Sequence, residues 1–376
     1  MDVGLYMNKT TVLGLVAILA VFSACATQQQ VTPEKNFSIR LIENGTAVEI
    51  TGFRKHSVSD LIIPSSIQGL PVVSIGDTAF FNKQIATVFI PPTVRRIGNG
   101  AFGDNNIREL ALPGTVTHIG EWAFMHNSIV SISIPASVRY IEAFAFAGNS
   151  IVAIEVPGSV IHLGDGAFAN NRLRELEIPS GITRIGNWTF GGNQIRTLRM
   201  HSNVTHIGDG AFEGNRLVSV AIPLSVTHIG SRAFRFNNLA SIFIPERVTY
   251  IGGMAFAQNR LATVVLPTRL TYMGMEAFAN NRISTIAIPN DLRRIGDGAF
   301  ADNRLDELVI PQGVTHIGSA AFTRNRLRTV IIPSSVTHIG SHAFLNNRLT
   351  RVVVPVTVVK GFEVFDPRVV EARVVY

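Results

Sequence analysis

The chain has 376 residues, a formal net charge of +7 and a single cysteine. One cysteine excludes an intramolecular disulfide, so the folded part of the chain must be held together by its core. The positive charge suits anionic partners and carries no information about the fold. Length alone predicts two or three globular domains, but an internal repeat predicts one elongated domain instead.

Residues 1–24 are predicted to be a signal peptide of the lipoprotein type. Lys9 supplies a positive charge, and the apolar run at 12–22 is too short to cross a bilayer as a mature helix. Small residues precede Cys25, and the segment resembles a bacterial lipobox, which implies that Cys25 is lipidated and becomes the N-terminus. Phe22 departs from that pattern, because leucine is commoner at its position.

Two alternatives stay open for this leader. An ordinary signal peptidase would cut near Ala24 or Ala26 and leave no lipid. Translation starts at Met1 or at Met7, and a start at Met7 would remove Asp2, an unusual residue in such a segment. In each case the leader lies outside the folded domain.

Residues 25–35 are predicted to be the lipid anchor and a polar tether, and residues 36–64 an N-terminal β cap. Within the cap, two segments that alternate apolar and polar residues flank Asn44-Gly45. This pattern predicts a hairpin with a type I′ turn. A cap is needed because the end of a solenoid exposes its core and an unpaired sheet edge.

Residues 65–355 repeat with a period of 22 residues, which is typical of a stacked repeat protein. Phe marks the register, and Pro, Gly, Ala and Asn recur in columns of their own. The first copy is longer, because Gln68-Gly69-Leu70-Pro71 adds a turn. The Phe column occupies positions 80, 102, 124, 146, 168, 190, 212, 234, 256, 278, 300, 322 and 344, and Asn recurs from Asn105 to Asn347.

Each column has a structural interpretation. The segment I-x-I-P predicts a short strand that Pro ends, since Pro cannot donate the next ladder hydrogen bond. The segment V-T-x-I-G predicts a second extended piece followed by a turn. The Phe rings are expected to stack in the centre, and the Asn side chains to bond turn backbone as an internal ladder. Neighbouring copies would bury one another, so stability is a sum of nearest-neighbour contacts.

The pattern N-x-L-x-x-I-x-I-P-x-x-V-T-x-I-G-x-x-A-F resembles the BspA-type leucine-rich repeat of bacterial surface proteins, known also from treponemes, over about residues 40–355. The resemblance implies a mainly β, right-handed leucine-rich repeat solenoid, with strands on the concave face and short extended segments on the convex face. It also implies adhesion to host matrix proteins or other bacteria, and it carries over no catalytic residue. Glu142, Thr189 and His201 depart from single columns and are expected to disturb only local packing.

Residues 356–376 are predicted to be a C-terminal cap of one or two strands. They are rich in β-branched residues and lack the Phe and Asn register. Phe344 is therefore expected to lie in the end coil, with fewer neighbours than a central ring.

No catalytic residue, cofactor or metal site is predicted. The G-D-G within 163–168 lacks the third glycine and the βαβ context of a dinucleotide site. Six of the ten histidines share one column with Tyr and Arg, and two adjacent imidazoles without a third ligand make a poor zinc site. This column is expected to be a solvent-facing surface that is sensitive to mild acid. Its histidines are His118, His162, His206, His228, His316 and His338.

A second column presents arginine in five consecutive coils at the C-terminal end. Neighbouring coils lie about 5 Å apart, so these like charges repel and stability alone would not select them. A strip that binds an anionic group is one interpretation, and a solvated ridge whose stems cover apolar edges is the other. The candidate ligand-binding arginines are Arg260, Arg282, Arg304, Arg326 and Arg348.

The outward-facing column of the I-x-I-P strand changes from charged to apolar along the chain. Glu155, Glu177 and Arg199 occupy it early, and apolar residues occupy it later. An exposed apolar stripe predicts a contact surface, and ordinary β propensity is the alternative explanation. The candidate contact residues are Val265, Val309, Ile331 and Val353.

A third set, Trp122, Phe144 and Trp188, shares the column two residues before Phe. Packing under the corner of the coil is the favoured interpretation for these rings, and a small exposed patch is the alternative.

The predicted function is a non-enzymatic bacterial surface lipoprotein that acts as an adhesin-like interaction scaffold. The expected partner is a host matrix or cell-surface protein or another bacterial protein, with an anionic glycan as a further candidate. No nucleic acid is expected, and membrane contact is expected through the lipid anchor only. The predicted location is membrane-anchored, at the cell surface or in the periplasm, and the alternative function is a periplasmic structural or assembly lipoprotein.

Overall fold

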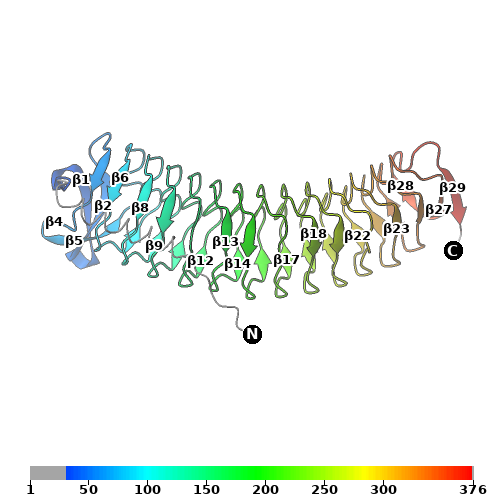
Figure 1. The fold of residues 1–376 in the computed structure, drawn as a ribbon, viewed down its shortest axis with the longest axis horizontal. Coiled ribbons are helices and arrows are strands. Elements are labelled where there is room, and N and C mark those ends of the chain that lie inside the picture. Colours follow the sequence, from blue (N-terminus) through cyan, green and yellow to red (C-terminus); the bar gives the residue numbers. More distant parts are fainter. Residues whose placement is uncertain (1–30, 375–376) are drawn as a thin grey trace, which may run out of the picture.

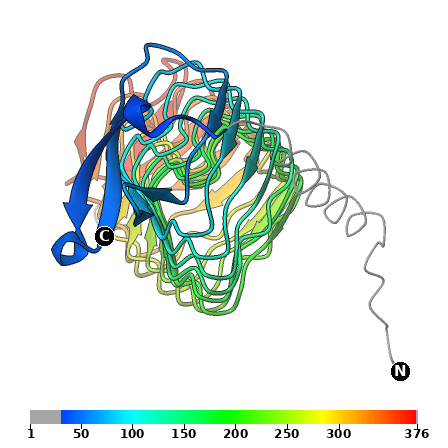
Figure 2. The same ribbon diagram turned by 90° about the vertical axis from the view of Figure 1, so that its left-hand side faces the viewer.

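The computed structural model describes residues 31–374 as a long, mainly β solenoid of stacked coils. Figure 1 shows the coils in a single row from the N-terminal to the C-terminal end, and Figure 2 looks along that row. The predicted solenoid with 22-residue repeats is therefore confirmed. The only helices among the described residues are two 3₁₀ turns, η1 (Glu34–Asn36) and η2 (Glu43–Gly45).

Most coils carry a three-residue strand from the I-x-I-P segment, and we call the surface formed by these strands the I-x-I-P face. The middle residue of each strand is buried, and the two flanking residues are exposed except at Ile62 of β3, as alternation along a strand requires. These strands are β3 (Asp60–Ile62), β6 (Thr87–Phe89), β8 (Glu109–Ala111), β10 (Ser131–Ser133), β13 (Glu175–Glu177), β15 (Thr197–Arg199), β18 (Ser241–Phe243), β20 (Thr263–Val265), β23 (Glu307–Val309) and β25 (Thr329–Ile331).

A second, two-residue strand precedes the Gly column in most repeats, and we call this surface the I-G face. Its second residue is buried in all of these strands except β28, and its first residue is exposed or half-buried. The strands are β7 (Arg96–Ile97), β9 (His118–Ile119), β11 (Tyr140–Ile141), β12 (His162–Leu163), β14 (Arg184–Ile185), β16 (His206–Ile207), β17 (His228–Ile229), β19 (Tyr250–Ile251), β21 (Tyr272–Met273), β22 (Arg294–Ile295), β24 (His316–Ile317), β26 (His338–Ile339) and β28 (Val359–Lys360).

Strand pairing is parallel within the solenoid, and two coil boundaries among the described residues lack it on both faces. On the I-G face, pairing stops between β12 and β14 and again between β21 and β22. On the I-x-I-P face, the described residues show no strand pair across the same two boundaries. At the first boundary the buried Thr189 replaces the smaller Ala, and the Phe168–Phe190 ring centroids lie 6.0 Å apart, the widest spacing of the Phe column. The larger side chain and the wide ring spacing thus occur at the same boundary.

The Phe rings form one continuous stack through the centre of the solenoid. Neighbouring rings are nearly parallel, and the closest centroids are 5.2 Å apart, between Phe80 and Phe102 and between Phe102 and Phe124. The stack is longer than the repeat predicts, because Phe365 of the C-terminal segment stacks on Phe344 at 5.4 Å. The expectation that Phe344 lies at the end with fewer neighbours is therefore wrong. At the other end, Phe53 packs at a tilt on Phe80 with centroids 5.7 Å apart.

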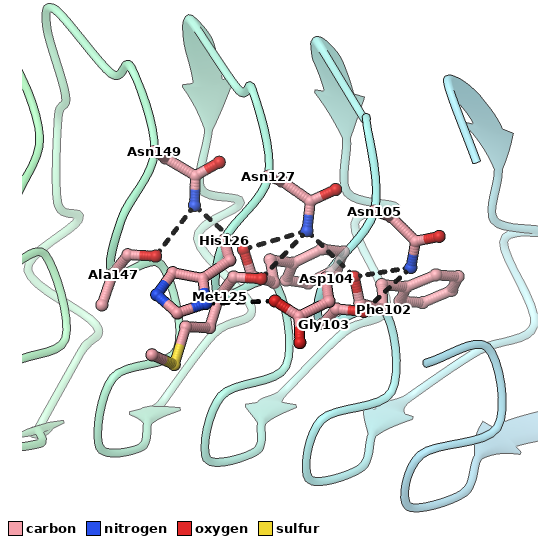
Figure 3. Close-up of polar contacts among 10 residues, drawn as sticks. Phe102, Gly103, Asp104, Asn105, Met125, His126, Asn127, Ala147 and Asn149 are labelled. Atoms are coloured by element: carbon pink, nitrogen blue, oxygen red, sulfur yellow. Dashed lines mark hydrogen bonds and ion pairs between the residues drawn. The ribbon is translucent and has the colours of Figure 1, made fainter. Parts of the chain in front are cut away.

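The Asn column forms the predicted internal ladder (Figure 3). The Asn105 Oδ1 accepts a hydrogen bond from the backbone N–H of Ile85 in the preceding coil, at 3.0 Å. Its Nδ2 donates to the carbonyl oxygens of Phe80 and Phe102, both at 2.9 Å. Asn127 and the later asparagines repeat this arrangement. Each buried amide thus joins two coils and satisfies turn groups that water cannot reach.

The N-terminal segment forms an antiparallel hairpin of β1 (Phe37–Ile42) and β2 (Ala47–Phe53). Its loop has four residues rather than two, because Ile42 pairs with Ala47, so the expected type I′ turn at Asn44-Gly45 is wrong. The extra turn of the first copy is a tight hairpin between β4 (Ser66–Ile67) and β5 (Leu70–Ile75). Both of its loop residues, Gln68 and Gly69, have positive φ, as a type I′ turn requires.

The C-terminal segment continues the solenoid rather than ending it abruptly. β28 pairs with β26 on the I-G face, and β29 (Val370–Val374) pairs with β27 (Arg351–Pro355) on the I-x-I-P face. Two strands therefore follow residue 356, within the predicted range of one or two.

Candidate functional site

The five candidate arginines form an arginine ridge, Arg260, Arg282, Arg304, Arg326 and Arg348, with all side chains exposed. Backbone hydrogen bonds keep the ridge in register, because each arginine N–H donates to a carbonyl of the preceding coil. The distances are 3.0 Å from Arg260 to Leu239 and 2.9 Å from Arg282 to Leu261. Within residues 31–374, no ion pair or hydrogen bond engages the guanidinium groups of the ridge. Five neighbouring cations thus remain available to an anionic partner.

The apolar stripe consists of Val265, Val309, Ile331 and Val353 on the I-x-I-P face. Val309 is 78% exposed and Ile331 is 65% exposed, which is high for large apolar side chains. Parallel pairing places Val309 opposite Ile331 and Ile331 opposite Val353. Val353 is only half-buried rather than fully exposed, because β29 pairs alongside β27 and sets Ala372 opposite Val353. The freely exposed part of the stripe therefore ends at Ile331.

The ridge and the stripe belong to the same coils. Within each coil the two columns are five residues apart, which limits their separation to about 16 Å for an extended chain. One extended partner is long enough to contact both surfaces.

A depression of about 610 Å³ lies on the I-x-I-P face at the first interrupted boundary. Its lining includes the exposed carboxylates of Glu155, Glu175 and Glu177, together with Arg199 and His201. This part of the face is therefore mainly acidic, whereas the C-terminal half carries the arginine ridge.

The histidine column forms ring stacks on the I-G face. His316 and His338 stack with centroids 4.6 Å apart, and His228 stacks on Tyr250 at 4.2 Å. Burial lowers the pKa of His316, and the adjacent His338 and Arg294 lower it further. Burial also lowers the pKa of His228, against an opposing effect of a nearby carboxylate. At His316 and His228 the fold thus favours the neutral imidazole.

No group of three or more His, Cys, Asp or Glu side chains that could hold a metal ion occurs in the described part of the chain. In the same residues, no helix is long and apolar enough to cross a membrane. Cys25 and the predicted leader lie outside the described residues.

The coil geometry defines a class: a repeat solenoid with Phe and Asn ladders and two short strands in most coils. The sequence pattern of the BspA-type leucine-rich repeat region matches four overlapping stretches, 46–174, 117–239, 162–282 and 229–351. Together they span most of the chain, so the protein belongs to the BspA-type leucine-rich repeat family. None of the curated proteins compared with the chain matches it.

Two solved structures are similar to the whole solenoid. A leucine-rich cell surface protein from Faecalibacterium prausnitzii shares 22% identity, with 91% of this chain and 96% of that chain covered and a TM-score of 0.53. The pneumococcal vaccine antigen PcpA shares 16% identity, with 92% and 98% covered and a TM-score of 0.51. At these identities the likeness supports the fold alone.

Proposed function

We propose that the protein is a non-enzymatic interaction scaffold that binds a host or bacterial macromolecule along the C-terminal half of its solenoid. The observation that carries this proposal is the arginine ridge, which stacks like charges with no acidic partner among the described residues. Repeat proteins use such long surfaces for binding. The occupant that fits best is an extended segment with acidic groups on the ridge and apolar groups on the stripe.

The two surfaces predict different kinetic defects in a binding experiment. Changing Arg282, Arg304 and Arg326 together to Gln is expected to slow association and flatten its salt dependence, because exposed charges mainly set the association rate. Changing Val309 and Ile331 to Ser is expected chiefly to speed dissociation. A pull-down with the full chain against purified matrix proteins supplies the partner, and surface plasmon resonance measures both rates.

The matched control is the double change of Arg172 and Arg216 to Gln. These arginines occupy the same column but stand in isolated coils, so this variant should bind like the parent. Circular dichroism checks that every variant is folded. If the triple arginine variant and the Val309, Ile331 variant both bind like the parent, the C-terminal half is not the site, and the acidic depression becomes the next candidate.

We also propose the predicted arrangement of the whole chain: leader 1–24, anchor and tether 25–35, N-terminal cap 36–64, solenoid 65–355 and C-terminal cap 356–376. In this arrangement a lipid on Cys25 holds the solenoid at a membrane, at the cell surface. The resemblance of the leader to a lipobox and the BspA-type repeat of bacterial surface proteins support that placement. A periplasmic structural or assembly lipoprotein is the second candidate, supported by the same leader.

Cys25→Ala is expected to move the protein from the detergent phase to the aqueous phase and to abolish incorporation of labelled palmitate. The lipidation proposal fails if the variant still partitions with detergent and still takes up label. Protease treatment of intact cells then separates the two locations, because only a surface protein is cleaved.

A further inference from the structure

A row of aromatic rings lies along one edge of the N-terminal half of the solenoid. It consists of Trp122, Phe144 and Trp188, in the column two residues before the stacked Phe. Trp122 is 48% exposed and Trp188 is 40% exposed. Backbone hydrogen bonds between coils keep the row in line, with Trp122 N–H donating to Ala143 at 3.0 Å and Phe144 N–H to Asp165 at 2.8 Å. The expectation that these rings pack entirely beneath the corner is wrong for the tryptophans.

The backbone at these positions does not favour aromatic residues. Trp122, Phe144 and Trp188 have φ of 55°, 54° and 56°, in the left-handed region where a side chain costs about 1–2 kcal/mol. Glycine occupies the same column in several other coils, including Gly166 and Gly210. The positive φ recurs at this column in every coil, also where it holds Thr78, Arg232 or Met254, so the left-handed turn belongs to the repeat and does not by itself mark the row.

Two of the rings pack closely against a glycine of the next coil. A Cβ added to Gly166 would come within 2.3 Å of the Phe144 ring, and one added to Gly210 within 2.7 Å of the Trp188 indole. One face of each ring is therefore covered by backbone, while the ring as a whole stays partly exposed. Glycine is needed at 166 and 210 because the aromatic ring of the preceding coil occupies the space that a Cβ would take.

Polar side chains run beside the rings in the adjacent column. Asp165, Asn187 and Asp209 are exposed, and each accepts through Oδ1 a hydrogen bond from the backbone N–H of the next coil, at 2.7–2.8 Å. These bonds fix the orientation of the side chains. Asn187 Nδ2 also donates to Asp165 Oδ2 at 3.0 Å. Asp209 uses its Oδ1, and its Oδ2 has no hydrogen bond inside the described chain. Oriented acceptors thus flank a flat apolar surface.

We propose that this aromatic row binds a neutral polysaccharide that lies along the solenoid. The C–H face of a pyranose ring carries partial positive charge and suits the negative face of an indole or phenyl ring. Its hydroxyl groups suit the carboxylate and amide oxygens of Asp165, Asn187 and Asp209. Those carboxylates, together with Glu121 beside Trp122, repel sulfated and carboxylated glycans, which suit the arginine ridge instead. The proposal is therefore independent of the protein partner proposed above.

The chain's two tryptophans both lie in this row, so its intrinsic tryptophan fluorescence reports directly on the site. The probes are four soluble neutral polysaccharides, mixed-linkage β-glucan, xylan, galactomannan and dextran, with dextran sulfate as the charged counterpart. At least one neutral polysaccharide is expected to retard the full chain in a native affinity gel and to shift its emission to the blue. Dextran sulfate is expected to leave the emission unchanged.

The decisive variants are Trp188→Ala and Gly210→Ala, each expected to lower the affinity about tenfold. Gly210→Ala keeps every ring but displaces the Trp188 indole. Gly298→Ala is its matched control, because Gly298 lies in the same column with a φ of 61° against 60° at Gly210. Its added Cβ would come closest to the flexible Glu276 side chain, at 3.0 Å, and would meet no ring. The backbone strain is thus common to both glycine variants, and circular dichroism confirms their fold.

Three results would overturn the proposal. One is that no neutral polysaccharide retards the chain or shifts its emission. Another is that Gly210→Ala and Gly298→Ala bind equally well. The third is that only a protein partner, and no polysaccharide, perturbs the tryptophans, which would make the row a protein-binding surface.

Discussion

Replacing Phe212 with alanine is expected to lower the free energy of unfolding by about 3–5 kcal/mol. The ring is fully buried and stacks on Phe190 at 5.9 Å and on Phe234 at 5.5 Å. Its coil cannot collapse into the cavity, because the Phe212 N–H donates to the Ala233 carbonyl at 2.8 Å and holds the coil spacing. A guanidinium titration followed by circular dichroism measures the loss.

The control for this prediction is Phe365→Ala at the end of the stack. Within residues 31–374, Phe365 stacks on one ring, Phe344, so its loss should be smaller. Phe344→Ala should behave like the central variant, since Phe344 is fully buried and stacks on Phe322 as well as on Phe365. A loss at Phe365 as large as that at Phe212 would contradict the nearest-neighbour description of the core.

Asn215→Ala is expected to cost about as much, roughly 3–5 kcal/mol, for a different reason. The Asn215 Oδ1 accepts from the Ile195 N–H at 2.9 Å, and Nδ2 donates to the Phe190 and Phe212 carbonyls at 3.0 and 3.1 Å. Alanine leaves the Ile195 N–H buried without a partner, which costs about 1–3 kcal/mol. It also removes one hydrogen bond from each carbonyl, at about 1 kcal/mol each, although Asn193 and Asn237 still donate to the Phe190 and Phe212 carbonyls. The same titration measures the effect.

Asn215→Asp separates the hydrogen bonds from the volume of the side chain. A carboxylate keeps the acceptor but points negative charge at the two carbonyls, so the folded state should favour the protonated acid. The folded protein then binds more protons than the unfolded chain, and the stability deficit of this variant should shrink as the pH falls. A deficit that grows or stays constant on acidification would show that the amide donors matter little. Asn347→Ala, at a half-buried position, should be milder.

The core was predictable because each column of the repeat has the same structural role in every 22-residue copy. The Phe stack and the Asn ladder follow from residue type and spacing alone. Phe365 was missed because it comes 21 residues after Phe344, without the neighbouring Ala and Asn of a regular copy. The interrupted strand pairing was also missed, because it depends on small differences between copies, such as Thr189 in place of Ala.

The candidate sites were predictable as columns but not as surfaces. The sequence placed the arginine ridge and most of the apolar stripe on exposed positions. It did not reveal that β29 partly covers Val353, because that contact depends on a strand outside the repeat register. Nor did it reveal that the Trp188 indole lies on Gly210, since this contact joins unlike residues of two coils.

The two boundaries without strand pairing, between β12 and β14 and between β21 and β22, are expected to be the flexible joints of this rod-like solenoid. At each one the coils are held by the Phe stack, the Asn ladder and the corner hydrogen bonds, but by no sheet on either face. Bending should therefore concentrate there. The second joint falls between Arg260 and Arg282, inside the arginine ridge. A partner that engages all five arginines would bridge this joint and restrict its bending. Part of the binding free energy would be lost in restricting that motion. A partner held from Arg282 to Arg348 alone would leave the rod free to flex.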